Sequence, residues 1–267
     1  MKIAIIGTGN MGTAIARGLV KGSLFKPSDI TCTAKSEKTL DKIKAINSGF
    51  IVSTDNMEAA RHADIIIIAV KPRYVEQIIT EIKPVLDYEK QMLVSVAAGI
   101  STDSLNSFLG RSNNSANSVG LPLFRVMPNT AIEVLSSMTL VSASDASDEQ
   151  TNLILRIFNE LGKAILIEER LMGAGTALAS CGLAFALRYI RASMEGGIEL
   201  GFTPENAQEL IVYTMKGAAD LLLENKSNPE VEIDKITSPG GITIKGLNEM
   251  ELSGFTSSVI QGLKACR

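Results

Sequence analysis

One stretch near the start of the chain decides the fold: Ile3-Ala4-Ile5-Ile6-Gly7-Thr8-Gly9-Asn10-Met11-Gly12. Four apolar residues lead directly into the glycine pattern GxGxxG, and residues of helical character follow. In such a turn Gly7 permits the tight bend, Gly9 lets a pyrophosphate approach the backbone, and Gly12 lets the helix pack on the strand. The free N–H groups at the helix start can bind phosphate. The stretch therefore predicts a dinucleotide-binding strand–turn–helix.

Short β-branched runs alternate with helical stretches over the first half of the chain, which is typical of a parallel sheet with crossover helices. A run from Ile65 to Val70 is apolar throughout, as expected of a central strand that is covered on both faces. Ser147 and Gln150 have the spacing of a capping box that opens a helix. The sequence thus predicts an α/β fold, a doubly wound parallel sheet of Rossmann type. Its strands are expected over 2–6, 30–33, 65–70, 92–96 and 124–127, with edge strands over 138–142 and 164–167.

The strand pattern stops after about residue 168. We expect one long helix over 171–200 and a second helix that begins at Thr203-Pro204 and runs to about Glu224. A polar loop, the stretch Thr237-Ser238-Pro239-Gly240-Gly241 and a last helical segment follow. We therefore predict a dinucleotide-binding domain over 1–165 and an all-helical domain over 166–267.

The composition narrows the class of protein. The chain has 267 residues, of which 45% are hydrophobic and 21% charged, with a net charge of −3; these values are normal for a globular protein. Basic residues do not cluster, so we expect no nucleic-acid partner. Cys32, Cys181 and Cys266 are far apart, which matches neither a disulfide framework nor a metal site and favours a reducing compartment. We expect no metal.

Two apolar segments bear on location. The first is interrupted by Gly7 after four residues, which is too short for a signal peptide. The second, from Leu171 to Leu187, has no charged residue but is at the short limit for crossing a bilayer. A helix buried inside the protein or in a dimer interface is favoured, because it would otherwise expose a sizeable apolar face. We expect a cytoplasmic homo-oligomer without a membrane partner.

His62 is the single histidine, and it lies before an apolar run, where a surface or helix-end position is the ordinary interpretation. Ser-His-Asp catalysis, histidine-based hydride relays and histidine-rich metal sites are therefore disfavoured. The reaction must need little acid–base help.

The end of the second strand bears on the choice of cofactor. An NAD site usually has Asp or Glu there to bind the ribose 2′-hydroxyl, whereas this chain has Lys35 and Ser36, with no acid until Glu37. Lys35 and Ser36 could bind a 2′-phosphate, which favours NADPH and leaves NADH possible. The alternative is that Lys35 is a solvated surface lysine and Ser36 a helix cap.

Other strand ends carry small or polar residues, namely Val70-Lys71-Pro72, Ser95-Val96-Ala97-Ala98-Gly99 and Arg125-Val126-Met127-Pro128-Asn129-Thr130. Ligands of doubly wound sheets bind at these ends, so we expect one crevice. In the second half, a Ser-Pro-Gly-Gly loop that runs into a helix exposes backbone N–H groups and could hold a small carboxylate; a simple interhelical turn is the alternative.

These motifs, in this order, resemble the pyrroline-5-carboxylate reductase family over nearly the whole chain. They are Ile6-Gly7-Thr8-Gly9-Asn10-Met11-Gly12, Ala69-Val70-Lys71-Pro72, Arg125–Thr130, Gly217-Ala218-Ala219, and Thr237–Gly241 with Thr243. The resemblance implies reduction of 1-pyrroline-5-carboxylate to L-proline with NADPH or NADH. It also implies a Rossmann domain followed by a helical dimerisation domain, a substrate bound at the dimer interface, and an assembly that could reach a decamer.

Matching by position implies site residues. Cofactor contacts fall on Ile6, Gly7, Thr8, Gly9, Asn10, Met11, Asn56, Ala69, Val70, Lys71, Pro72, Ala97, Ala98 and Gly99. The loop with Ser238, Gly240, Gly241 and Ile242 would hold the substrate carboxylate, Thr243 would hydrogen-bond the imine nitrogen as the catalytic residue, and Glu169 falls near the substrate. The chain departs from the family pattern Gly-Ser-Gly-Pro-Ala-Tyr at Ala179–Phe185, where the Pro and the Tyr hydroxyl are missing.

A cyclic imine accepts hydride without a strong general base, so a chain with one histidine can perform this reaction. Two other functions remain open at this stage. An NADP-dependent hydroxy-acid dehydrogenase would need a proton acceptor, for which the lysines of the helical half are candidates. A non-catalytic NADP-binding paralogue is suggested by the altered stretch 180–185.

Overall fold

The computed structural model describes residues 1–111 and 120–266. The chain divides into two compact units: Met1–Ser180, here the sheet unit, and Cys181–Arg267, here the helical unit. The Rossmann-type α/β fold followed by a helical domain is confirmed. The domain boundary that we place at residue 165 stays a prediction; it falls near the end of the last strand.

The described part of the sheet unit contains one eight-stranded sheet in the order β3-β2-β1-β4-β5-β6-β7-β8. The seven strands expected from the sequence are present, with ends shifted by a residue or two. The sequence analysis missed β3, which has three partly exposed residues at the sheet edge and so lacks a strong apolar pattern. The strands are β1 (Ile3–Ile6), β2 (Ile30–Thr33), β3 (Ile51–Ser53), β4 (Ile65–Ile68), β5 (Met92–Ser95), β6 (Leu123–Met127), β7 (Ser137–Ser144) and β8 (Gly162–Leu166).

The pairing departs from the expected all-parallel sheet at one place. β7 runs antiparallel to β6, whereas the other neighbours are parallel. Only a short 3₁₀ helix, Thr130–Val134, separates β6 from β7. Because a parallel connection needs a crossover of a dozen or more residues, this short connection can return the chain only as an antiparallel neighbour.

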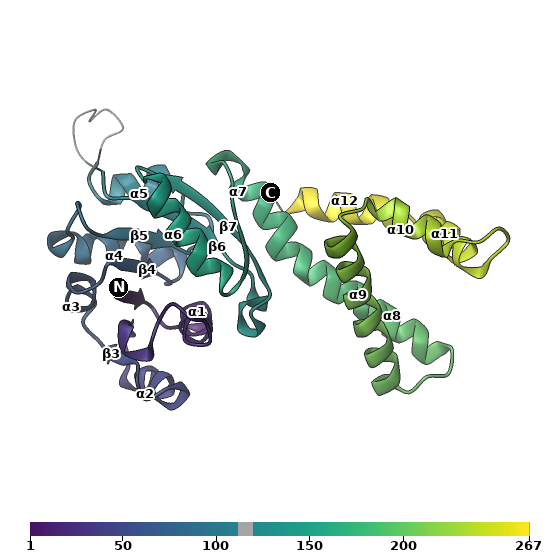
Figure 1. The fold of residues 1–267 in the computed structure, drawn as a ribbon, viewed down its shortest axis with the longest axis horizontal. Coiled ribbons are helices and arrows are strands. Elements are labelled where there is room, and N and C mark those ends of the chain that lie inside the picture. Colours follow the sequence, from purple (N-terminus) through teal and green to yellow (C-terminus); the bar gives the residue numbers. More distant parts are fainter. Residues whose placement is uncertain (112–119, 267) are drawn as a thin grey trace. The chain divides into compact units, whose positions relative to one another are not determined.

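Helices cover both faces of the sheet (Figure 1). On β1, Ile3 and Ile5 pack with one group of helices, and Ala4 and Ile6 with the other, because successive side chains of a strand point to opposite faces. All four residues of β4 are at most 1% exposed, as expected of a central strand. One face carries α1 (Asn10–Leu19), α2 (Glu37–Ile46) and α6 (Asp148–Asn159); the other carries α3 (Asn56–Arg61), α4 (Val75–Ile82) and α5 (Thr102–Phe108).

The long helix expected over 171–200 is interrupted. A 3₁₀ turn (Glu169–Leu171) and α7 (Met172–Thr176) lead into a π-helical turn at Ala177–Cys181, and α8 (Gly182–Glu199) follows. The π turn coincides with the start of the stretch that departs from the family motif. π turns insert an extra residue per turn and are frequent at functional sites.

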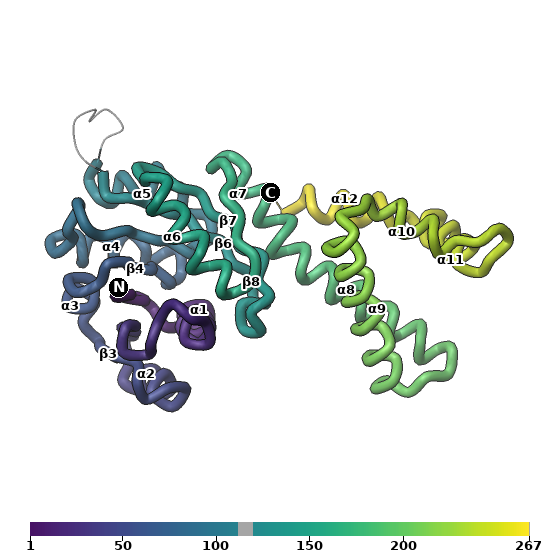
Figure 2. Tube along the Cα trace, in the orientation of Figure 1, coloured from purple at the N-terminus to yellow at the C-terminus, as the bar shows by residue number. Residues whose placement is uncertain are grey.

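The helical unit is built from α8, α9 (Pro204–Asn225), α10 (Pro229–Ile236), α11 (Ile242–Leu252) and α12 (Phe255–Ala265). α8 packs against α9, as the tube in Figure 2 shows. The expected polar loop after Glu224 is wrong, because Asn228 caps α10 and Pro229 starts it. The expected last helix is two helices, which break at Gly254 with φ 81°.

The helical unit buries very little of its own surface. Ala207 is the one buried residue among its described positions. Large apolar side chains stand exposed on every one of its helices, such as Leu187, Leu223 and Ile242. One helical run, Glu169–Glu199, also has the length and apolar composition of a membrane span, with 11% of its apolar window buried in the chain. We therefore expect these exposed apolar surfaces to be covered by another molecule.

Candidate active site

The sheet register brings the loops expected to bind the cofactor to one edge. Ile6 of β1 pairs with Thr33 of β2 and with Ile68 of β4, and Ile68 pairs with Ser95 of β5. The four strands therefore end level with one another, and the segments after them start side by side. The backbone N–H of Ala69 donates to the Ile6 carbonyl at 2.8 Å, which ties two of these ends together.

The glycine loop is held by close contacts that leave no room for side chains. Gly7 has φ 95°, and a Cβ there would lie 2.5 Å from Cγ1 of Val70. A Cβ on Gly12 would lie 2.4 Å from the Gly7 carbonyl oxygen. The backbone N–H of Thr8 donates to the Thr33 carbonyl at 2.9 Å, which anchors the loop to β2. A Cβ on Gly9, by contrast, would meet no atom within 4 Å, so that this part of the loop is open to a ligand.

The open side of this loop faces a cavity of about 560 Å³ between α1 and α2. Helix α1 has no acidic residue in its first turn, so its N-terminal N–H groups can take a pyrophosphate. The loop and the helix end fit a dinucleotide. The cavity is lined by Thr8, Gly9, Asn10, Thr13, Ala14, Arg17, Thr39, Lys42, Ile43, Ile46 and Glu133.

Asn56, expected at the cofactor, begins α3 and is held from two sides. The Thr33 hydroxyl donates to its Oδ1 at 2.7 Å, and its Nδ2 donates to Oε1 of Glu81 at 3.1 Å. The amide is therefore fixed at the end of β2. Glu81 could not be predicted as this partner, because a lone glutamate on α4 carries no local signal of this role.

The sequence allows the segment after β2 to be either a 2′-phosphate site or a surface lysine followed by a helix cap, and the structure has features of both. The Ser36 hydroxyl caps α2 by accepting from the Thr39 N–H at 3.3 Å, which is the ordinary alternative. Lys35 is exposed, and its Nζ lies 4.7 Å from the centre of the Tyr74 ring, in the connection that follows β4. Lys35 therefore lies at the edge where the cofactor is expected.

The remaining expected cofactor residues lie at the same edge. Lys71 and Pro72 are exposed at the start of the connection after β4, with Lys71 in an extended conformation as a residue before proline should be. Ala97 is buried below the edge, while Ala98 and Gly99 are exposed, and Gly99 has φ 77°. The structure thus brings together the expected residues of the sheet unit.

Glu169 forms the one charged pair of the described sheet unit in which a partly buried carboxylate meets a largely buried arginine. Arg125, 11% exposed and projecting from β6, donates to its Oε1, and the backbone N–H of Thr102 donates to the same oxygen at 3.2 Å. Burial raises the pKa of Glu169. Hydrogen bonds from the Arg125 side chain and the Thr102 N–H, together with the charge of Arg125, outweigh the effect of burial, so that the pKa lies below its ordinary value.

The second carboxylate oxygen of Glu169, Oε2, is buried and has no hydrogen-bond partner among the described residues. A buried acceptor on a charged group is costly to leave unpaired, and the Ser142 side chain also lowers the pKa of this carboxyl. The sequence analysis named Arg125 only as part of a motif. A charged residue inside an otherwise apolar strand was the signal for its role.

The expected substrate loop belongs to the helical unit and is described here by itself. The Gly241 N–H donates to the Ser238 carbonyl at 2.9 Å, which closes a turn, and Gly240 has φ 72°. Gly241 is the N-cap of α11, whose first turn has no acidic residue. Ile242 is exposed and Thr243 half-buried on that first turn. The turn can therefore hold a carboxylate next to a hydroxyl.

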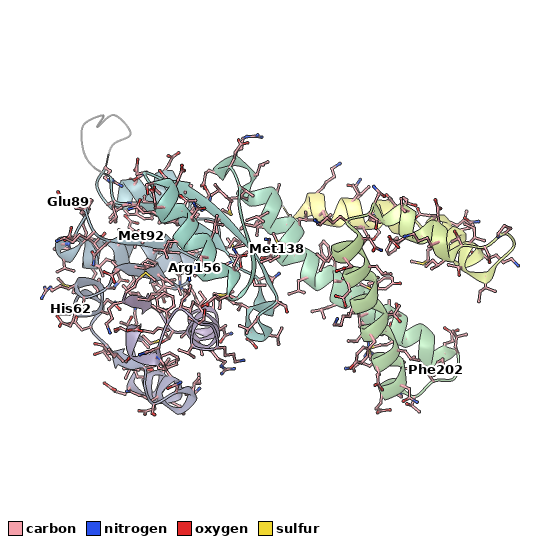
Figure 3. The ribbon with its side chains drawn as sticks, in the orientation of Figure 1. His62, Glu89, Met92, Met138, Arg156 and Phe202 are labelled. Atoms are coloured by element: carbon pink, nitrogen blue, oxygen red, sulfur yellow. The ribbon has the colours of Figure 1, made fainter. Side chains whose placement is uncertain are left out.

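Other residue types offer little chemistry. His62 lies exposed at the end of α3, and its Nε2 is 3.0 Å from Oε1 of Glu58. Figure 3 labels His62 in the sheet unit. No cluster of three metal-ligating side chains occurs in residues 1–111 and 120–266. The lysines of the helical unit are exposed, and the hydrogen bond that Lys216 donates to Asp220 raises the pKa of Lys216, which is the wrong direction for a proton acceptor. These lysines are therefore poor candidates for the proton acceptor that a hydroxy-acid dehydrogenase would need.

A Rossmann sheet with an open glycine loop, followed in the chain by a helical unit with a glycine turn before α11, is the architecture of a nicotinamide-dependent oxidoreductase. Two family models match the chain. The one described as NADP oxidoreductase, coenzyme F420-dependent, matches residues 2–99, and the one described as pyrroline-5-carboxylate reductase dimerisation matches residues 169–267.

The chain is 40% identical to pyrroline-5-carboxylate reductase 2 of Dictyostelium discoideum, over 98% of this chain and 89% of that protein. It is 38% identical to pyrroline-5-carboxylate reductase 1 of the same organism, of whose length it spans 48%. The crystal structure of Plasmodium falciparum pyrroline carboxylate reductase with NADP bound matches with a TM-score of 0.86 and 27% identity, over 100% of this chain and 95% of that chain. The chain belongs to the pyrroline-5-carboxylate reductase family.

The Arg125–Glu169 pair makes a stability prediction. Arg125→Met leaves a partly buried carboxylate without its cation, so we expect the free energy of unfolding to fall by about 2 kcal/mol near pH 7. Arg170→Met, which removes an exposed partner of Glu168, is the control and should cost less than about 1 kcal/mol. Urea unfolding at one fixed protein concentration measures both.

The pH dependence follows from the lowered pKa of Glu169. A carboxyl whose pKa is lower when folded contributes its full stability above its unfolded pKa, and loses it as the pH falls through the folded value. The difference between wild type and Arg125→Met should therefore persist at neutral pH and shrink below about pH 4. A difference that is unchanged in acid would contradict the charge pairing.

Proposed function

We propose that this protein reduces 1-pyrroline-5-carboxylate to L-proline with NADPH, the last step of proline biosynthesis. The observation that carries the proposal is the joint presence of two anion-binding helix starts in a member of this family. One follows Gly9 in the sheet unit, and the other follows Gly241 in the helical unit. The first suits a pyrophosphate and the second a small carboxylate.

The cofactor residues proposed are those at the carboxyl edge of the sheet. The glycine loop and the start of α1 hold the pyrophosphate, Asn56 is fixed for the ribose, and Lys35 favours NADPH over NADH. When bound, NADPH supplies the hydride that reduces the carbon–nitrogen double bond. The proposed set is Ile6, Gly7, Thr8, Gly9, Asn10, Met11, Gly12, Lys35, Ser36, Asn56, Ala69, Val70, Lys71, Pro72, Ala97, Ala98 and Gly99.

The substrate is proposed to bind the turn before α11. Backbone N–H groups at the end of the Ser238–Gly241 turn take the substrate carboxylate, and neither Gly240 nor Gly241 has a side chain to obstruct it. The Thr243 hydroxyl, in the first turn of α11, hydrogen-bonds the imine nitrogen. Glu169 is proposed as a further substrate contact from the resemblance to the family, and its negative charge suits a substrate whose nitrogen is protonated.

The reaction makes small demands on acid–base chemistry, because a protonated imine carbon is already electrophilic. Catalysis then depends on holding the reacting carbon and the nitrogen in place, a contribution that positioning alone can make large. The rigid turn at Gly241 and the short side chain of Thr243 serve that purpose.

We propose that two copies associate through the helical unit, as the family model for dimerisation suggests, and that dimers assemble further into a decamer. Support comes from the exposed apolar residues of α8 to α12, which a second copy can cover. The run Glu169–Glu199 is proposed to be covered in the same way and not by a bilayer. The three free cysteines suit a cytoplasmic protein.

The activity is tested by the loss of NADPH absorbance in the presence of 1-pyrroline-5-carboxylate, with NADH in parallel. We expect rapid oxidation that depends on the imine, faster with NADPH, and L-proline as the product. A folded protein that binds NADPH but oxidises neither cofactor would overturn the reaction and favour the non-catalytic alternative.

The role of Thr243 is tested by substitution. Thr243→Ala removes a hydrogen bond worth roughly 1–3 kcal/mol in the transition state, so kcat/KM should fall about tenfold to a hundredfold. Thr243→Ser keeps the hydroxyl and should retain most of the activity. If Thr243→Ala has the kcat/KM of the wild type, the hydroxyl has no part in the reaction.

The assembly is tested by light scattering on size-exclusion fractions at micromolar concentration. We expect a mass of at least twice 28.5 kDa, and ten times that value for a decamer. A species of 28.5 kDa would show that the apolar faces of the helical unit are not an interface between copies.

A further inference from the structure

A cluster of two cations around one aromatic ring lies beside the glycine loop, and we call it the Tyr74 cluster: Lys35, Arg73 and Tyr74. The Lys35 Nζ lies 4.7 Å from the centre of the Tyr74 ring, and the Arg73 Cζ lies 4.9 Å from the same centre. Both distances are within the range of cation–π attraction. Two like charges therefore contact the same aromatic ring.

The cluster joins two connections that lie far apart in the sequence. Lys35 follows β2, whereas Arg73 and Tyr74 lie in the 3₁₀ turn Pro72–Tyr74 after β4. These two strands flank β1 on its two sides, and the glycine loop follows β1. The cluster therefore lies at the sheet edge where the adenosine half of a dinucleotide is expected.

The positive charge of the cluster is not neutralised within the described residues. None of the ion pairs found there includes Lys35, Arg73 or the neighbouring Lys71, although all three are exposed. A hydrogen bond from Arg73 and the charges of Arg73, Lys35 and Lys71 lower the pKa of the Tyr74 hydroxyl, which shows the sign of the local field. The nearest acids in the sequence, Glu37 and Glu76, form no such pair.

We propose that Lys35, Arg73 and Tyr74 form the subsite for the adenosine 2′-phosphate of NADPH, in which the Tyr74 ring positions both cations. This inference rests on the proposed function only in the identity of the cofactor. A phosphate monoester carries nearly two negative charges, and an arginine guanidinium can bind two of its oxygens at once. The ring offsets the repulsion between the cations and restricts their side chains before the ligand arrives.

The Tyr74 cluster supplies a second donor for the 2′-phosphate, which Ser36 does not. The Ser36 hydroxyl accepts from the Thr39 N–H and lies 2.9 Å from the Thr39 hydroxyl, so its local bonds are made. Arg73 acts as the second donor to the phosphate, beside Lys35. It lies in the connection after β4, on the opposite side of β1 from Lys35. Discrimination against NADH is then assigned to two connections, and not to the residues after β2 alone.

The test compares the dissociation constants of NADPH and NADH, which differ only in the 2′-phosphate, by nicotinamide fluorescence without substrate. Arg73→Gln should weaken NADPH about tenfold or more and leave NADH within about twofold, as the loss of a charge-assisted hydrogen bond requires. Arg61→Gln, an exposed arginine on α3, removes the same charge elsewhere and should change neither constant.

The positioning role of the ring needs a second pair of variants. Tyr74→Leu should weaken NADPH severalfold without affecting NADH, whereas Tyr74→Phe keeps the ring and should resemble the wild type. Retained NADH binding reports that each variant is folded. The subsite is overturned if Arg73→Gln weakens both cofactors equally or neither, and the ring's role is overturned if Tyr74→Leu behaves like Tyr74→Phe.

The outcomes separate this inference from the proposed function. A protein that prefers NADPH through these residues but reduces no imine keeps the subsite and loses the reaction. A protein that reduces 1-pyrroline-5-carboxylate, with an unchanged preference in Arg73→Gln and Tyr74→Leu, keeps the reaction and loses the subsite.

Discussion

The close approach of α1 to the end of β1 is the constraint on which the sheet unit depends. The Gly7 carbonyl and the Gly12 backbone lie so near each other that any side chain on Gly12 would collide with the oxygen. That contact places the start of α1 directly after the strand, with its N–H groups turned toward the open side of Gly9. The same contact lets α1 pack on the sheet, where Ile15 and Leu19 join the core. Folding and cofactor binding thus share one arrangement of backbone, because both need the helix to begin where the strand ends.

The helical unit differs from the sheet unit in how it is stabilised. Its described residues bury almost nothing within the chain, and apolar side chains stand exposed on each helix. Such a unit gains too little from burial to offset the entropy of ordering its helices by itself. Association between copies is therefore part of how this unit becomes stable, and not an addition to a finished fold. The turn at Ser238–Gly241 lies in this unit.

The chemistry suits a chain with few catalytic side chains. The helix starts after Gly9 and Gly241 present backbone N–H groups with no acidic residue in the first turn. Arg125 fixes Glu169 from β6, and Glu81 fixes Asn56 from α4. Each of these partners comes from a strand or helix remote in the sequence. Since hydride transfer to an imine needs precise placement more than proton transfer, rigidity of the scaffold is the property that the reaction requires.

The sequence by itself determined the strands with strong apolar patterns, the glycine loop, the single exposed histidine and the caps at Ser147 and Thr203, because each depends on neighbouring residues only. It missed β3, whose three residues form a strand only by pairing with β2, and α10, whose cap at Asn228 lies in a polar run. Tertiary structure alone decided the contact of Glu169 with Arg125 and the contact of Lys35 with Tyr74. Such contacts join residues tens of positions apart, and the register of a folded sheet sets which side chains meet, a quantity that no local pattern contains.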